Sequence, residues 1–194
     1  MRGLLGTTNP SKVKRFSDLL KGYDIEFITL RDIEVIEEPK EMGNTPEENA
    51  IMKAELYGQY FDVVICNDSG LYFEELDFED LRQPGLNIRT PMNMDRLSDE
   101  EMIDYYSKLI TGLGGKVTAY YLDGIAVYNH GVISSFMDNM AAQKNGSFYM
   151  IDKASSKRFE GWPLDSLSIN KENGKYFVDL SLIHISEPTR PLYI

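Results

Sequence analysis

The sequence predicts an α/β protein with a mixed central β-sheet flanked by helices. Two observations favour this class: helical apolar patterns and short apolar runs alternate over the first 112 residues, and the chain after Gly115 changes to antiparallel-strand patterns. A chain of 194 residues that is 42% hydrophobic and 26% charged suits one soluble globular domain, or one domain with a small second lobe. We expect this domain to span residues 1–180.

The first half of the chain alternates strand and helix signals. The motif Thr45-Pro46-Glu47-Glu48 combines an N-cap, a proline at the first helical position and a glutamate at the third, so a helix is expected to begin there. The expected elements are a strand within 2–8, a helix with its apolar face from Val13 to Leu20, a strand over 25–30, a helix over 45–60 and a strand over 63–66.

The second half carries one helix and then strands. A second capping box, Ser98-Asp99-Glu100-Glu101, precedes apolar residues at helical spacing. Antiparallel strands are expected over 116–129, 131–140 and 146–152, with a tight turn near 129–131.

The charge balance limits the partners. The chain has 31 acidic and 20 basic residues and a net charge of −11, which argues against binding to nucleic acid or to a membrane surface, because both need a basic face. No apolar run approaches the roughly 20 residues of a membrane helix, and no signal peptide opens the chain, so we expect a cytoplasmic protein. The single cysteine, Cys66, excludes an intrachain disulfide framework.

The last 14 residues, SLIHISEPTRPLYI, carry no clear period and contain two prolines. They are similar to the translation of sequencing-adapter DNA. We therefore expect residues 181–194 to be a non-native tail that replaces the natural C-terminus.

The first candidate phosphate site is the polar loop that contains Thr7, Asn9 and Lys12. It lies between a strand and a helix, where backbone N–H groups and the helix dipole favour an anion. The alternative is an ordinary helix-capping loop. The segment is not a Walker A loop, because that motif's glycines and its Gly-Lys-Ser/Thr ending are absent.

A second cluster surrounds the start of the helix expected from Thr45. Glu41 precedes this helix, and Asn49 and Lys53, four residues apart, share one of its faces. Capping and a solvated helix face would explain the same residues. Glu48 suits a capping partner better than a ligand.

The third cluster is Asn67-Asp68-Ser69-Gly70, directly after the expected strand over 63–66. We expect the strand to end at Cys66, and Ser69 and Gly70 to form a turn that lets a ligand approach the backbone. Ligands of open α/β sheets bind outside the carboxyl ends of strands, so Asp68 could hold Mg²⁺ or accept a proton from an attacking water. The alternative is an Asx-turn without function.

The fourth cluster, residues 158–166, places Trp162 near Asp165 in a turn that contains glycine and proline. The aromatic ring could stack on a nucleotide base, although such segments are more often packed loops.

Together and in this order, these residues resemble the inosine triphosphate pyrophosphatase family. The family carries the motifs Thr-x-Asn-x-x-Lys, Glu-x-Gly-x-Thr-x-x-Glu-Asn-Ala-x-x-Lys-Ala and Asp-Asp-Ser-Gly-Leu, and then a Pro-Gly turn. The matching residues are Thr7, Asn9 and Lys12; Glu41, Gly43, Thr45, Glu48, Asn49, Ala50, Lys53 and Ala54; Asp68, Ser69, Gly70 and Leu71; and Pro84 and Gly85. The close match covers roughly the first 90 residues.

The chain departs from the family pattern in three places. Asn67 replaces the first aspartate of the central pair, which removes one charge near the metal. The family's aromatic Phe-Gly-Tyr-Asp-Pro loop is matched only loosely by residues 161–165, and its closing Lys and Ser-His-Arg motif is not found.

The resemblance implies an elongated two-lobed fold with the active-site cleft between the lobes. It also implies Mg²⁺-dependent hydrolysis of non-canonical purine triphosphates (ITP, dITP, XTP) to the monophosphate and pyrophosphate, by a homodimer. The implied roles are Asp68 and Lys53 in catalysis; Glu41 and Asp68 as metal ligands; and Thr7, Asn9, Lys12, Asn49, Ser69, Arg89, Trp162 and Asp165 in substrate binding.

Three alternatives stay open. A Maf-like pyrophosphatase shares the architecture but prefers pyrimidine or modified nucleotides. A nucleotide-binding homologue without catalysis would be consistent with Asn67 and the missing C-terminal motif. A structural α/β protein without a ligand is the third.

Overall fold

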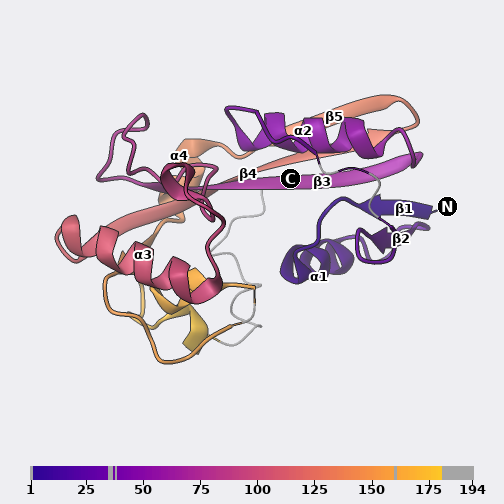
Figure 1. Cartoon of the computed structure of the whole chain (residues 1–194). Coiled ribbons are helices and arrows are strands. Elements are labelled where there is room, and N and C mark those ends of the chain that lie inside the picture. The colour runs from indigo at the N-terminus through magenta and orange to yellow at the C-terminus, as the bar shows by residue number, and fades with distance from the viewer. Residues whose placement is uncertain (1, 35–36, 38, 160, 181–194) are drawn as a thin grey trace. The chain divides into compact units, whose positions relative to one another are not determined.

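The computed structural model describes residues 2–34, 37, 39–159 and 161–180, so the predicted tail lies outside the described residues. The chain divides into two compact units (Figure 1). The first contains Met1–Ser69 and Asp123–Met137, and the second contains Gly70–Leu122 and Asp138–Ile194. The single domain over 1–180 stays a prediction.

The first unit is built on parallel strands. Its elements are β1 (Arg2–Leu5), α1 (Pro10–Leu19), β2 (Glu26–Thr29), α2 (Pro46–Tyr57), the first part of β3 (Val63–Phe73), the last part of β4 (Lys116–Asn129) and β5 (Val132–Met137). Strand β1 lies between β2 and β3 and is parallel to both, whereas β5 pairs antiparallel with β4. The unit therefore carries a mixed sheet, as expected.

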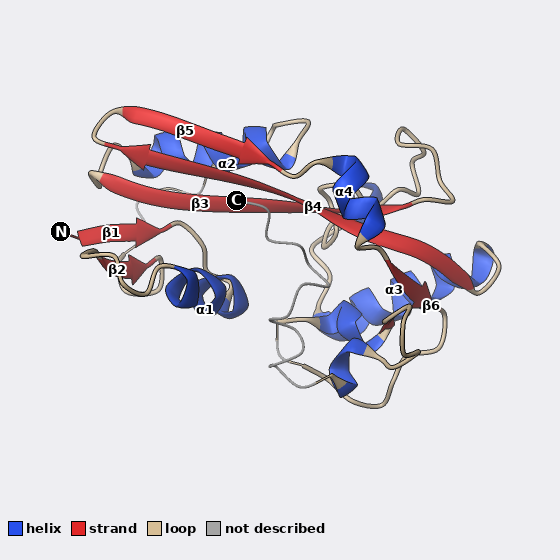
Figure 2. Ribbon diagram, turned by 180° about the vertical axis from the view of Figure 1, so that it is seen from behind, coloured by secondary structure: helices blue, strands red, loops and turns tan. Residues whose placement is uncertain are grey.

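Helices α1 and α2 lie on opposite faces of this sheet. Successive side chains of a strand point to opposite faces. On β4, Asp123 bonds to Arg15 of α1, whereas Gly124 abuts the backbone of Pro46 and Glu47 at the start of α2. Figure 2 shows α2 behind β4 and β5. The apolar residues that α2 buries are Ala50, Ala54 and Tyr57, which pack with Leu4, Val64 and Ala126 of the strands.

The second unit packs one long helix on antiparallel strands. It contains the other parts of β3 and β4, α3 (Asp99–Gly112), α4 (Met140–Asn145), β6 (Phe148–Ile151), β7 (Ser168–Ile169) and 3₁₀ turns at Pro91–Asn93, Pro163–Ser166 and Phe177–Asp179. Strand β6 pairs antiparallel with β4 and with β7. The core of the unit includes Met102, Ile103, Tyr106 and Ile110 of α3 together with Val117 and Met150.

Two expected boundaries are wrong. Strand β3 continues to Phe73 and does not end at Cys66. The polar residues after Cys66 are bonded across the sheet instead of leading into a turn, because the side chains of Asn67 and Ser69 reach β4. Gly70 also keeps a φ outside the left-handed region that a glycine turn would need.

The strand expected over 131–140 is shorter, because β5 ends at Met137 and α4 begins at Met140. Asn139 caps this helix by accepting hydrogen bonds from the N–H groups of Ala141 and Ala142. The turn near residues 129–131 is confirmed, with left-handed φ values at His130 and Gly131. Among the described helices, none combines the length and the apolar character needed to cross a membrane.

The N-cap of α2 gives a first testable prediction. The Thr45 hydroxyl accepts a hydrogen bond from the N–H of Glu48 at 3.1 Å. We expect Thr45→Ala to lower the free energy of unfolding by about 1 kcal/mol, because one N–H at the helix start loses its partner. Urea unfolding measures the change, and Ser17→Ala on the exposed face of α1 is the matched control. Equal unfolding midpoints for the two variants would contradict the capping role.

Candidate active site

The candidate site lies where β1 stops and β3 continues. Leu5, the last residue of β1, is paired with Ile65 of β3, and the N–H of Gly6 donates to the Ile65 carbonyl at 2.8 Å. The chain then turns into α1, while β3 runs on through residues 67–69. The connections through α1 and through α2 lie on opposite faces of the sheet, so this edge is a topological switch point, the place where open α/β sheets bind ligands.

Asp68 faces α2 across this edge. Its Oδ2 accepts a hydrogen bond from Nδ2 of Asn49 at 2.9 Å, and its Oδ1 accepts one from Nζ of Lys53 at 3.1 Å. The next residue, Ser69, points to the other face and donates its hydroxyl to Asp123 at 2.5 Å. The two faces of β3 therefore carry two separate polar clusters.

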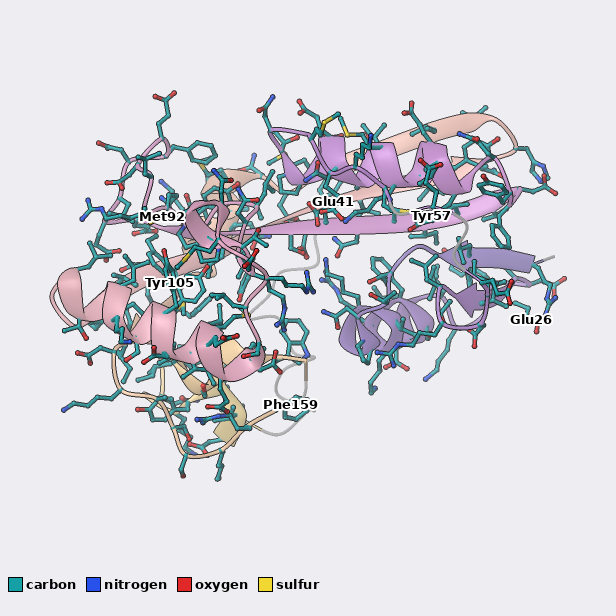
Figure 3. The ribbon with its side chains drawn as sticks, viewed as in Figure 1. Glu26, Glu41, Tyr57, Met92, Tyr105 and Phe159 are labelled. Atoms are coloured by element: carbon teal, nitrogen blue, oxygen red, sulfur yellow. The ribbon has the colours of Figure 1, made fainter. Side chains whose placement is uncertain are left out.

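Lys53 bridges the two carboxylates that were predicted to converge. Its Nζ lies 2.8 Å from Oε1 of Glu41 and 3.1 Å from Oδ1 of Asp68. Figure 3 shows Glu41 alongside β3. Burial would lower the pKa of Lys53, but the charge of Asp68 and the hydrogen bond to Glu41 outweigh it and raise that pKa. Lys53 is therefore a cation at neutral pH.

The loop that carries Glu41 is fixed to α2. The N–H of Gly43 donates to Oδ1 of Asn49 at 2.8 Å, and the N–H of Asn44 donates to the Glu48 carboxylate at 2.7 Å. A Cβ at Gly43 would come within 2.7 Å of the Asn49 oxygen, so only glycine fits this approach. As expected, Glu48 is a partner of the helix start.

Lys12 lies in the first turn of α1, near both clusters. Burial lowers its pKa, and the negative charges of Asp123, Asp68 and Glu41 partly oppose this shift. In the preceding loop, Oγ1 of Thr7 accepts a hydrogen bond from the N–H of Asn9 at 3.2 Å, which shapes the turn.

Asn67 is buried and ties β3 to β4. Its Nδ2 donates to the carbonyls of Asp68 and Gly124, both at 3.0 Å, whereas its Oδ1 has no partner among the described residues. An ionised aspartate could not donate to these carbonyls. The amide therefore suits this environment, in which a carboxylate would face two acceptors.

The donor set suits magnesium. Mg²⁺ is commonly held by one or two carboxylates together with waters and substrate phosphates. Glu41 and Asp68 already share one cation, Lys53, and both can offer oxygen ligands. No group of three or more acidic, histidine or cysteine side chains suited to a metal ion occurs in the described part of the chain. A two-carboxylate site of this kind would depend on the substrate for further ligands.

Three predicted substrate-binding residues belong to the second unit. Arg89 pairs with Asp99 at 2.7 Å and donates to the Leu97 carbonyl at 3.3 Å. Asp165 is buried within the 3₁₀ turn Pro163–Ser166, which Trp162 precedes. The roles of Arg89, Trp162 and Asp165 at a nucleotide stay predictions.

The sequence reasoning missed Asp123 and Arg15. Asp123 interrupts an apolar strand between Leu122 and Gly124, which was a signal of a buried charge that needs a partner. Its partner, Arg15, is 108 residues away in the chain, and no local pattern links the two.

The fold and this site define an α/β protein with carboxylates and lysines gathered at a topological switch point. Comparison with known proteins identifies the family: the Ham1 family matches residues 4–143, and the chain belongs to it. This confirms the resemblance that the sequence motifs predicted.

Two comparisons place the chain among relatives. It is 37% identical over 87 residues to the dITP/XTP pyrophosphatase of Thermoanaerobacter pseudethanolicus, a match that covers 44% of this chain and 42% of the relative. It is 45% identical over 76 residues to the dITP/XTP pyrophosphatase of Bacillus subtilis, covering 38% of this chain and 37% of the relative. The matched segment thus spans less than half the length of these curated relatives.

Solved structures match over nearly the whole chain. The Ham1 protein of Staphylococcus aureus superposes with a TM-score of 0.72 at 22% identity, covering 96% of this chain and 90% of that one. A HAM1 protein from Coxiella burnetii gives a TM-score of 0.72 at 19% identity, with coverage of 95% and 89%. These likenesses confirm the predicted α/β fold with a mixed sheet flanked by helices.

Proposed function

We propose that this protein hydrolyses the non-canonical purine nucleoside triphosphates ITP, dITP and XTP to the monophosphate and pyrophosphate, with Mg²⁺ as cofactor. The observation that carries the proposal is the bridge of Lys53 between Glu41 and Asp68 at the switch point. Membership of the Ham1 family and the name that the curated relatives share, dITP/XTP pyrophosphatase, support the substrate class.

Glu41 and Asp68 are the residues that would hold Mg²⁺. When bound, the ion would neutralise phosphate charge and lower the pKa of a coordinated water. A metal ion between Glu41 and Asp68 would displace the ammonium of Lys53, which would then pair with a phosphate oxygen. Lys12 adds a second amino group whose electrostatic interactions include both of these carboxylates.

Asp68 is the proposed general base for the water that attacks the α-phosphorus. Asn49 orients the Asp68 carboxylate through Oδ2, and Asn49 is itself held by the loop at Gly43. A fixed carboxylate needs little reorganisation when it accepts a proton. Positioning and charge neutralisation then supply most of the rate enhancement, as is usual in phosphoryl chemistry.

The remaining predicted residues complete the proposal. Thr7 and Asn9 bind phosphate from the loop before α1, and Arg89 adds a cation. Trp162 and Asp165 border the base. We further propose a cytoplasmic homodimer that binds neither nucleic acid nor membranes, in keeping with the net charge of −11.

A pyrophosphate-release panel tests the proposed function. Purified protein is incubated with ITP, dITP, XTP and the common purine and pyrimidine triphosphates, with Mg²⁺ and then with excess chelator. We expect pyrophosphate from the three non-canonical purines and no release under chelation. Release of orthophosphate instead of pyrophosphate would contradict the reaction, and a preference for pyrimidine or modified nucleotides would select the Maf-like alternative.

A second candidate is a nucleotide-binding protein without turnover. Asn67 favours this candidate, because it places a neutral amide where the inosine triphosphate pyrophosphatase motif has an aspartate. Calorimetry with ITP distinguishes the two candidates: binding without pyrophosphate release would select the non-catalytic one.

A further inference from the structure

Asp123 is an ionised carboxylate inside β4, close to the proposed phosphate site. Its side chain is 16% exposed, and its strand neighbours Leu122 and Gly124 are buried. Burial would raise the pKa of Asp123, but the charges of Arg15 and Lys12 outweigh it and hold that pKa below its ordinary value. A buried charge of this kind persists only when its partners are well placed.

Both oxygens of Asp123 are engaged from different elements. Oδ2 accepts a hydrogen bond from Nη1 of Arg15 on α1 at 2.8 Å, and Oδ1 accepts one from Oγ of Ser69 on β3 at 2.5 Å. Lys12, one helical turn before Arg15, interacts with the same carboxylate through its charge. Asp123 thus connects the helix that carries Lys12 to the strand that carries Asp68.

The bond to Ser69 changes what this serine can offer a ligand. A hydroxyl has one proton and two acceptor lone pairs. The proton of Ser69 is donated to Asp123, so any further hydrogen bond at its oxygen must come from a donor such as an ammonium group or a water. If Ser69 bound substrate, as predicted, by donating its proton to a phosphate, this charge-assisted bond to Asp123 would have to break.

We propose that Asp123 is a positioning residue of the phosphate site, which fixes Ser69 as a hydrogen-bond acceptor and, through Arg15, holds the turn of α1 that carries Lys12. The proposal rests on the proposed function, because the ligand that Lys12 meets is the triphosphate or its pyrophosphate product. Asp123 acts through Ser69 and Lys12 and does not touch the reacting atoms. Its loss therefore weakens the binding of phosphate ligands more than it slows the chemical step.

A purely structural role makes a different prediction. If Asp123 only neutralises Arg15, a variant that lacks both charges should recover the stability, KM and pyrophosphate Kd that change when only the Asp123 charge is removed. The double variant D123N/R15M therefore separates the two roles. It also keeps the net charge of the cluster, which gives it a better chance of folding than D123N alone.

The experiment measures kcat and KM for ITP, and the Kd of inorganic pyrophosphate with Mg²⁺ by calorimetry. The proteins are the wild type, D123N, R15M, D123N/R15M, S69A and D123N/S69A. We expect D123N to raise KM and the pyrophosphate Kd about tenfold while kcat changes by less than about threefold. The double variant should regain the thermal midpoint of the wild type and keep the raised KM and Kd. Asp18→Asn, an exposed acid on α1, is the matched control and should change neither constant.

Three results would overturn the proposal: wild-type KM and Kd in the double variant, a fall in kcat without a change in KM, or effects of D123N and S69A on KM that multiply independently. Because Asp123 is proposed to act through Ser69, S69A should add little to D123N. If the wild type binds pyrophosphate but does not hydrolyse ITP, the proposed function fails, and the Kd series alone decides the role of Asp123. If the folded wild type neither binds pyrophosphate nor hydrolyses ITP, both proposals are overturned.

Discussion

Replacing Asp68 by asparagine is expected to lower kcat for ITP hydrolysis by about 10²–10⁴-fold, the usual contribution of a positioned general base. Asparagine keeps the size of the side chain and one acceptor oxygen, which can retain the bond from Asn49 or the bond from Lys53, because these two donors are bonded to different oxygens of Asp68. It cannot accept the proton of the attacking water, and it offers a weaker ligand to Mg²⁺. Pyrophosphate release under saturating ITP and Mg²⁺ measures the loss.

Asp77→Asn, at an exposed acid outside the site, is the matched control and should retain the wild-type kcat. The thermal midpoint of each variant shows that the protein is folded. A D68N variant with kcat within about threefold of the wild type would remove the base assignment and the shared metal ligand together.

The second large effect is expected on stability. Gly124→Ala should lower the free energy of unfolding by about 3 kcal/mol, because overpacking a tight contact forces the backbone to move. A Cβ at this position would overlap backbone atoms of Pro46 and Glu47, which, unlike a flexible side chain, cannot rotate away. Those atoms begin α2, which carries Asn49 and Lys53. Activity should therefore fall with stability.

Urea unfolding of G124A and G112A measures this effect. Gly112 ends α3, and a Cβ added there would meet no neighbouring atom within 4 Å, so its replacement should change the unfolding free energy by less than about 0.5 kcal/mol. Equal stability of G124A and the wild type would contradict the close approach of β4 to α2.

The elements with local signals could be predicted from the sequence. The caps of α2 and α3 were correct because a serine or threonine followed three residues later by glutamate satisfies the first N–H groups of a helix within four residues. That Glu41 and Asp68 would lie close together was predicted from the resemblance to the family motifs. In the structure, Lys53 pairs with both carboxylates and so offsets the repulsion between them.

The errors arose where distant residues override a local signal. The polar run at residues 67–70 favours a turn in isolation, but hydrogen bonds from Asn67 and Ser69 to β4, more than fifty residues away, keep it in a strand. Asp123 and Arg15 were missed for the same reason. Side-chain partners that meet only in the folded sheet leave no periodic pattern in the sequence.

The central claim is that Glu41 and Asp68 share one divalent cation, and binding of Mn²⁺ tests it most directly. Mn²⁺ is titrated into the wild type, E41Q and D68N in the presence of the α,β-methylene analogue of ITP, in which carbon replaces the scissile bridging oxygen, and free Mn²⁺ is followed by electron paramagnetic resonance. The account predicts that the wild type binds Mn²⁺ in the ternary complex and that each substitution weakens this binding by at least about tenfold. Unchanged Mn²⁺ affinity in both variants would contradict it.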